Sequence, residues 1–238
     1  MRARHSFVLS LLGLAAAVGA QRTWIIDAAG GQGHDFRPIG AGIAVAAAGD
    51  TLLVRTGTYV ESGLDIAEGL TIVADGVVRL ESPAFGTGLL VHDLAAHERF
   101  VMRGFELGGF ALNGHFSAQR CRGLVALHEV QTGLADTLGI NFVDCAQVDL
   151  SRGFVRGGVA SRDSGTVLRG VVVEGLVGWT VLCDGGSLVI DEATITGGNS
   201  PLNGFEAVHL TRGELRVSRC QVRSLPNRGG LGKQGARS

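Results

Sequence analysis

The stretch at residues 188–197 reads LVIDEATITG, and its pattern decides the fold. Apolar residues alternate with polar ones on both sides of the pair Asp191-Glu192, and Gly197 ends the run. The apolar positions are Leu188, Ile190, Ala193 and Ile195. Alternation predicts β-strands, and the run is too short for a helix. The two-residue interruption changes which positions are apolar, from even-numbered residues before it to odd-numbered residues after it. We therefore expect two short strands that meet at a sharp corner and point their apolar residues to one interior.

The pattern recurs along the chain, in copies that begin near residues 100, 125, 148, 166, 188 and 215. Repeats at such a period indicate one supersecondary unit stacked on its neighbours, each strand pairing in parallel with its equivalent about 4.8 Å away along the axis. A leucine-rich-repeat solenoid has similar spacing, but its fixed Leu/Asn consensus is missing here. We therefore predict an all-β, right-handed parallel β-helix of about eight coils over residues 21–225.

The residues at the corners predict how the coils align. Successive coils carry at the second corner position Gly104, Glu129, Arg152, Gly170, Glu192 and Arg219. Opposite charges on neighbouring coils stabilise a register, so we expect Glu129 beside Arg152 and Glu192 beside Arg219. The same alignment predicts one inward column that holds Leu150, Leu168 and Ile190.

Residues 1–20 read MRARHSFVLSLLGLAAAVGA and have the layout of a secretory signal peptide. Arg2 and Arg4 precede an apolar run, and small residues at 18–20 suit a cleavage site. The run is shorter than the ~20 apolar residues of a membrane anchor. No later segment is long and apolar enough to span a bilayer. We therefore expect a protein without a membrane span that is secreted into the extracellular space or periplasm or held at the cell surface.

Composition agrees with many short strands joined at bends, since the chain has thirty-eight glycines and four prolines. The formal net charge of −1 gives no global field that would favour nucleic acid as a partner. Residues 226–238 are basic and glycine-rich, which predicts a flexible tail. No amphipathic cap follows the last coil, so self-association through uncovered strand edges is a hypothesis.

The segment at residues 23–59 reads TWIIDAAGGQGHDFRPIGAGIAVAAAGDTLLVRTGTY. It resembles the opening of many secreted right-handed β-helix proteins of the pectate-lyase-like superfamily, with Thr56 where members often have Pro. The resemblance implies a capping segment at 23–49 and structural roles for Asp27 and Asp50. The residues agree with a short capping helix, because an apolar stripe falls near helical spacing. The stripe consists of Phe36, Ile39, Ile43 and Ala47.

The superfamily's fold assigns no activity, because it carries lyases, hydrolases, esterases, tailspikes and non-enzymatic surface proteins. The His-containing block of pectate lyases is not met, since Ala28 follows Asp27 where a histidine is needed. The Asp-Asp pair of polygalacturonases is absent. We therefore expect, without a cofactor, a secreted non-catalytic binding or structural module associated with a polysaccharide or another surface protein. The alternative is a polysaccharide lyase or glycoside hydrolase acting on acidic polysaccharide. A trimeric fibre segment is a third hypothesis.

Histidine and carboxylate residues cluster in the loop HDLAAHE, which holds His92, Asp93, His97 and Glu98. The spacing matches no metal motif with a known mechanism, so a solvated loop is favoured over a metal site. His92 and His97 are retained as candidate ligand contacts. Other histidines are isolated, and the sequence identifies no Ser/His/Asp set because it does not show proximity.

Two further sets of side chains have alternative interpretations. Trp179 is a candidate to stack on a sugar ring, or it fills a corner of the core, which is favoured. Outward positions carry Glu106, Glu174, Arg156 and Asp149. Converging oxygens would suit calcium, but these residues are spread over several coils, so a solvated polar face is favoured.

The four cysteines would meet an oxidising compartment after export. Cys121 and Cys145 precede the starts of their coils by four and three residues, which places them at nearly equivalent points one coil apart. That separation suits a disulfide, and two stacked reduced thiols are the alternative. Cys220 occupies an inward position, where we expect a buried thiol. Cys183 lies at a different point of its coil and is expected not to pair with Cys220.

Overall fold

The computed structural model describes residues 20–83, 86–109, 112–133, 139–175, 179–197 and 206–224. In this part of the chain the protein is all-β with one short helix, and it forms a right-handed parallel β-solenoid of about seven turns. The predicted fold class is confirmed, and the number of turns is close to the eight expected. The predicted signal peptide (all but its last residue) and the predicted tail lie outside the described residues.

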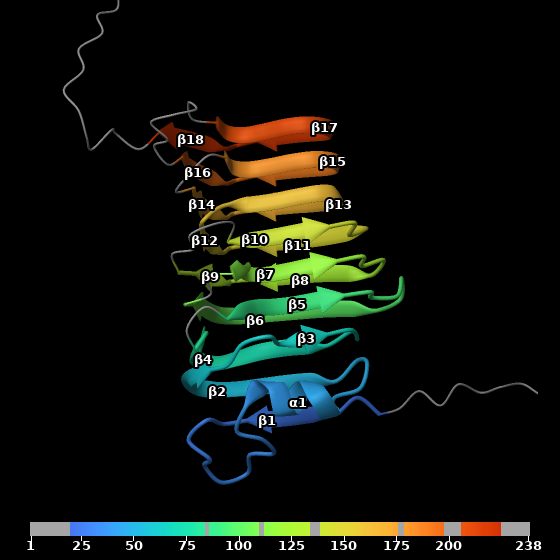
Figure 1. Cartoon of the computed structure of the whole chain (residues 1–238), viewed down its shortest axis with the longest axis vertical. Coiled ribbons are helices and arrows are strands. Elements are labelled where there is room, and N and C mark those ends of the chain that lie inside the picture. Colours follow the sequence, from blue (N-terminus) through green and yellow to red (C-terminus); the bar gives the residue numbers. More distant parts are fainter. Residues whose placement is uncertain are drawn as a thin grey trace, which may run out of the picture.

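The rungs stack along the longest axis, from β1 and α1 at one end to β17 and β18 at the other (Figure 1). The helix is α1 (Ile39–Val45). The strands are β1 (Thr23–Ile26), β2 (Thr51–Val60), β3 (Asp65–Ile66), β4 (Thr71–Glu81), β5 (Thr87–His92), β6 (Arg99–Gly108), β7 (Leu112–Gln119), β8 (Leu124–His128), β9 (Gln131–Thr132), β10 (Ile140–Val143), β11 (Gln147–Ser151), β12 (Phe154–Arg156), β13 (Val159–Arg169), β14 (Val172–Glu174), β15 (Trp179–Asp191), β16 (Thr194–Gly197), β17 (Glu206–Ser218) and β18 (Gln221–Ser224).

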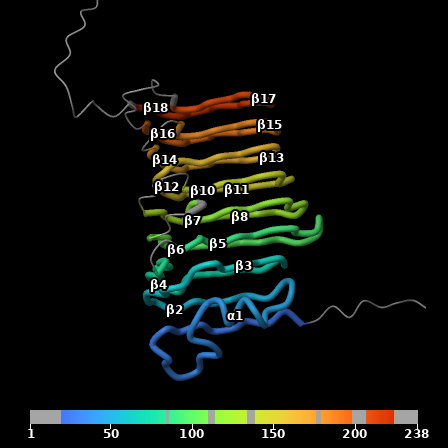
Figure 2. Tube along the Cα trace, viewed as in Figure 1, coloured from blue at the N-terminus to red at the C-terminus, as the bar shows by residue number. Residues whose placement is uncertain are grey.

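Neighbouring rungs pair in parallel, and the tube view shows them as nearly level layers (Figure 2). β11 pairs with β13 and β13 with β15, which places Leu150 opposite Leu168 and Leu168 opposite Ile190. All three side chains are fully buried. The predicted inward column is therefore confirmed, and it forms part of one continuous aliphatic core.

The corners confirm the predicted register. The six residues at the second corner position have φ between +53° and +79°, in the left-handed region. Arg152 Nη2 lies 3.3 Å from Glu129 Oε1, and Arg219 Nη1 lies 2.8 Å from Glu192 Oε1. These pairs are exposed and screened by solvent, so each contributes little to stability. Their main effect is to favour one alignment of the rungs.

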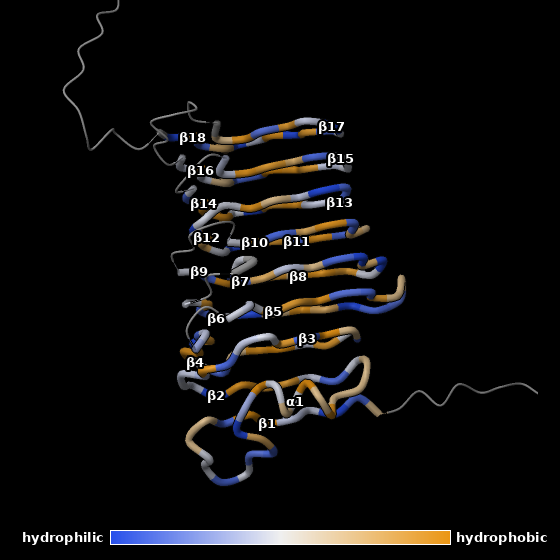
Figure 3. The backbone as a smooth tube through the Cα atoms, viewed as in Figure 1, coloured by the Kyte–Doolittle hydropathy of each residue, from blue (hydrophilic) through white to orange (hydrophobic). Residues whose placement is uncertain are grey.

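Hydrophobic residues recur along the strands of every rung, while hydrophilic residues gather at bends (Figure 3). Aromatic rings also enter the interior: the Phe116 ring centroid lies 5.9 Å from that of Phe100 and 6.2 Å from that of Phe142. Gly153 replaces an apolar residue of the repeat because a Cβ there would lie 2.6 Å from the carbonyl oxygen of Val130. The glycine thus lets two corners approach each other.

α1 packs against β1 and β2 at the first rung, as predicted for a capping segment. It is shorter than the stripe from 36 to 47 suggested, because Phe36 forms a β-bridge with Ile26 and Pro38 and Ala46 are extended. The Glu61 carboxylate accepts hydrogen bonds from the Ile39 and Gly40 N–H groups at 2.7 and 2.8 Å. An acidic side chain thereby satisfies the helix N-terminus.

Asp27 and Asp50 have structural roles, in agreement with the resemblance. Asp50 accepts hydrogen bonds from the Arg22 N–H, the Trp24 indole and the Ala47 N–H. Asp27 accepts from two backbone N–H groups of its turn and from Arg55. Burial raises the pKa of each carboxyl, but these hydrogen bonds outweigh burial and lower both pKa values overall.

Candidate functional site

Two columns of outward side chains run along the stack. One lies on the strands before the two-residue corner of the repeat, and the other lies on the strands after it. The column before the corner holds Val101, Ala126, Asp149, Val167, Val189 and Arg216. The column after the corner holds Glu106, Gln131, Phe154, Val172, Thr194 and Gln221. They are the surfaces on which this fold places side chains at regular intervals.

A hollow of about 400 Å³ lies after the corner, and we call it the second-strand groove. It spans strands β4, β6, β9 and β12. Its outward lining residues include Arg79, Glu106, Gln131, Phe154 and Arg156. The groove therefore crosses four rungs along the axis of the stack, with one or two side chains contributed by each rung.

Charges in the second-strand groove are paired across rungs. Arg79 Nε lies 2.7 Å from Glu106 Oε2, and Arg156 Nε lies 3.2 Å from Glu174 Oε2. The Arg156 guanidinium also lies 5.0 Å from the Phe154 ring centroid. Because each guanidinium faces a carboxylate, the groove offers planar donors and acceptors and an aromatic ring with little excess charge. Such a surface suits a polar, uncharged ligand better than an ion.

The outward carboxylates do not converge on a calcium site. Glu106 and Glu174 lie on different rungs, each beside an arginine, and Asp149 lies before the corner on β11. Within the described ranges, no group of three or more His, Cys, Asp and Glu side chains is placed to hold a metal ion.

The loop HDLAAHE does not form one cluster in the structure. Its Leu94 is buried in the core, which separates the first two residues from the last two. His92 contacts Asp65 and Asp93, with Nε2 and Nδ1 lying 2.6 and 2.7 Å from their carboxylate oxygens. His97 lines another hollow, of about 410 Å³. Ligand contact by either histidine stays a prediction.

His92 gives the protein a pH dependence whose sign follows from its neighbours. The Asp93 hydrogen bond raises the pKa of His92, burial opposes the rise, and the Asp65 charge adds to it. A raised folded-state pKa stabilises the fold fully below the unfolded value, near 6.5, and the gain disappears as pH rises through the folded pKa. We expect the difference in unfolding free energy between wild type and His92→Gln to shrink across that range.

Urea unfolding from pH 5 to pH 9 measures this difference. His97→Gln is the matched control for replacing a histidine of the same loop, because His97 makes neither carboxylate contact. A His92→Gln difference that does not change with pH would contradict the assignment.

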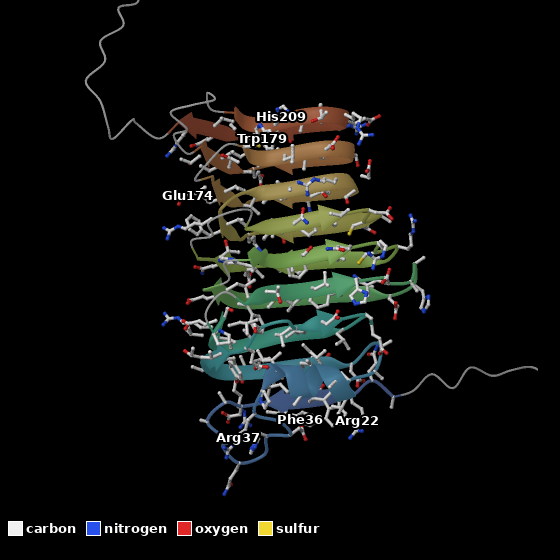
Figure 4. The ribbon with its side chains drawn as sticks, viewed as in Figure 1. Arg22, Phe36, Arg37, Glu174, Trp179 and His209 are labelled. Atoms are coloured by element: carbon white, nitrogen blue, oxygen red, sulfur yellow. The ribbon has the colours of Figure 1, made fainter. Side chains whose placement is uncertain are left out.

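Trp179 is exposed rather than buried, so the favoured interpretation of it as a core residue is wrong. About 47% of its surface is exposed, and its ring stacks on His209 with centroids 5.0 Å apart and planes at 24° (Figure 4). The physical reason is its place at the first residue of β15, at the edge of the rung. Contact with a sugar at Trp179 stays a prediction.

Cys121 and Cys145 lie at equivalent points of neighbouring rungs, as expected. The Ala146 N–H donates to the Cys121 carbonyl at 2.7 Å, and both side chains are buried. Both thiols are free. The Cys121 thiol donates to the Val91 and Gln119 carbonyls and the Cys145 thiol to that of Val143, so the disulfide stays a prediction. Cys183 is also a free, buried thiol. Cys220 is half-buried rather than buried, because it lies on the last rung that the structure describes.

One contact of functional interest was missed in the sequence. His128 Nδ1 lies 2.6 Å from Ser151 Oγ, and both residues line a hollow before the corner. The aligned repeat contained the signal, because coil starts at 125 and 148 place residue 128 opposite residue 151. The signal could have been found by pairing polar residues column by column.

The fold and these surfaces define the class of the protein, a right-handed parallel β-solenoid with polar grooves along its faces. No protein-family model, no curated protein and no solved structure matches the chain. Among the described residues, no helix has both the length and the apolar character needed to cross a membrane.

Proposed function

We propose that the protein is a secreted, carbohydrate-associated binding module that holds a glycan in the second-strand groove. The observation that supports the proposal is the groove itself, a hollow of about 400 Å³ that crosses four rungs and combines paired charges with an aromatic ring. Export and membership of the pectate-lyase-like superfamily are parts of this proposal. They rest on the N-terminal sequence and on the residues at 23–59.

The geometry of the solenoid supports an extended ligand. Successive rungs repeat about every 4.8 Å, so side chains of one column meet a chain-like ligand at regular steps. Arg, Glu and Gln side chains provide planar donors and acceptors for hydroxyl groups, and an aromatic face suits the apolar side of a sugar ring. Because the charges are paired, we expect a neutral glycan to bind at least as well as an acidic one.

Replacing Phe154 with alanine should weaken glycan binding by about tenfold or more, since a lost aromatic contact of about 1.4 kcal/mol changes affinity by that factor. A glycan array would find the ligand, and affinity electrophoresis would compare the variants. Thr194→Ala is the matched control: Thr194 shares the column of Phe154, two rungs along, but does not line the groove. Equal losses in both variants would contradict a site in the groove.

The exposed pair of Trp179 and His209 is a second place where a sugar could stack. Trp179→Ala should leave binding within about twofold of wild type if the second-strand groove is the site. If only Trp179→Ala lost glycan binding, the binding site would be assigned to the Trp179 and His209 pair instead. Release of unsaturated uronide from an acidic polysaccharide, followed by ultraviolet absorbance, would instead support the lyase alternative.

A further inference from the structure

A second hollow, of about 410 Å³, lies on the face before the corner and contains a hydroxyl, an imidazole and two carboxylates. The hydroxyl belongs to Ser151, the imidazole to His128, and the carboxylates to Asp149 and Glu192, of which Glu192 is paired with Arg219. Ser151 and His128 are register partners on β11 and β8, and Asp149 lies two residues before Ser151 on the same outward face. The strand ladder holds all three backbones in place, so the arrangement does not depend on a flexible loop.

The contact between Ser151 and His128 has the geometry of a nucleophile and its base. Ser151 Oγ and His128 Nδ1 are 2.6 Å apart, within the range expected for a general base and the proton it removes. In the tautomer with hydrogen on Nε2, the hydroxyl donates to Nδ1. A serine hydroxyl is a weak nucleophile unless such a base removes its proton.

Asp149 is a charged residue between two apolar residues of its outward column, which supports a functional role. Its register partners on the neighbouring rungs are Ala126 and Val167, which are apolar. Oδ1 of Asp149 is buried and has no hydrogen-bond partner among the described residues. A buried, unpaired carboxylate oxygen is costly. A carboxylate at this position can stabilise the positive charge that His128 acquires in a reaction, which explains why an acidic residue is found there.

Arginines surround the three groups. Arg103, Arg152 and Arg169 line the same hollow. Arg103 and Arg152 both contact Glu129, at 3.0 and 3.3 Å, and each of the three guanidiniums has more donors than these contacts use. Guanidinium groups at such a site can stabilise the negative oxygen that forms when a carbonyl is attacked.

We propose that Ser151 and His128 are catalytic residues that hydrolyse small carboxylic esters, with Asp149 as a positioning residue. His128 takes the Ser151 proton as Oγ attacks the ester carbonyl carbon, and the oxyanion forms beside the arginines. Collapse breaks the bond to the alkoxy oxygen, which leaves as the alcohol with the proton from His128. Water, deprotonated by His128, then attacks the acyl-serine and releases the carboxylic acid and the free serine. No oxidant or cofactor is needed.

This inference goes beyond the proposed glycan binding and does not rest on it, because the hollow lies on the other side of the corner. The test uses the full chain with a fluorophosphonate probe, which labels activated serines, and with p-nitrophenyl acetate as substrate. We expect the probe to label Ser151, located by peptide mass spectrometry. We expect Ser151→Ala and His128→Gln to lower hydrolysis by about 100-fold or more.

Ser218→Ala is the matched control. Ser218 occupies the same column as Ser151 on β17, but its hydroxyl donates to Asp191 rather than to a histidine. We expect its activity to stay within about twofold of wild type. Asp149→Asn should lower kcat with little change in KM. A smaller folded fraction would also lower the apparent kcat, so kcat is expressed per active site, titrated with the fluorophosphonate probe. Circular dichroism of each variant checks the fold.

Labelling of Ser151 together with loss of hydrolysis in Ser151→Ala supports the proposal. Labelling at another residue, no labelling, or hydrolysis by Ser151→Ala at the wild-type rate would overturn it. The two proposals fail separately, because Phe154→Ala should lose glycan binding and keep the label on Ser151.

Discussion

Replacement of Leu168 with alanine is expected to lower the free energy of unfolding by about 2–5 kcal/mol. Leu168 is fully buried between Leu150 and Ile190 in the inward column. The rungs above and below are held at a fixed spacing by the strand ladders, so they cannot move together to fill the space. The cavity therefore persists, and the substitution loses both buried apolar area and packing contacts.

Chemical unfolding followed by circular dichroism measures this effect. Val167→Ala is the matched control, because Val167 is adjacent in the chain, points outward and is only half-buried. We expect a loss of about 1 kcal/mol or less for the control. Equal effects of the two substitutions would contradict the assignment of the interior, and with it the solenoid.

Oxidation of Cys121 and Cys145 to a disulfide is expected to raise the free energy of unfolding by about 3 kcal/mol, the size typical of a closed loop of about 24 residues. The two buried cysteines lie at equivalent points of adjacent rungs, where the Ala146 N–H donates to the Cys121 carbonyl. The neighbouring Cys145 thiol lowers the pKa of Cys121, which makes Cys121 the more readily ionised of the two. Both thiols are buried, so the stack must open locally before the Cys121 thiolate attacks oxidised glutathione and Cys145 displaces the glutathione thiolate.

The test compares protein treated with oxidised glutathione against protein kept in reducing agent. Mass spectrometry should find the loss of two hydrogens and a peptide linking Cys121 to Cys145, together with a higher unfolding midpoint. Cys145→Ala should remove the difference in unfolding midpoint between oxidised and reduced protein. Cys183→Ala is the control, because Cys183 is a buried thiol without a cysteine partner and should keep that difference. Absence of the cross-linked peptide after oxidation would rule out the disulfide.

The sequence contained enough to predict the fold because each rung repeats the same physical requirement. Apolar residues must alternate on both sides of a corner, and charges at the corners must not repel. LVIDEATITG shows both features, and the contact between Glu192 and Arg219 confirms the alignment they predict. The capping helix was predictable for the same reason, but its bounds were not. Phe36 pairs with Ile26 instead of extending the helix.

The sites were less predictable, because each depends on residues that meet across rungs. Ser151 and His128 are 23 positions apart in the sequence, and their contact can be predicted only after two coils are aligned. Trp179 lies outside the repeated pattern, so nothing in that pattern fixed its orientation. In HDLAAHE the residues are close in sequence, but the buried Leu94 lies between the two histidines. His92 therefore contacts Asp65, whereas His97 lines a separate hollow.

The uneven spacing of the coils has a consequence for engineering. Residues 175–178 join β14 to β15, whereas twice as many, residues 198–205, join β16 to β17. Despite this difference, β15 and β17 remain register partners from Leu188 to Asp191. The interior is thus insensitive to what is inserted at this side of the molecule. Foreign peptides grafted there should be displayed in a row, at intervals fixed by the backbone of the host.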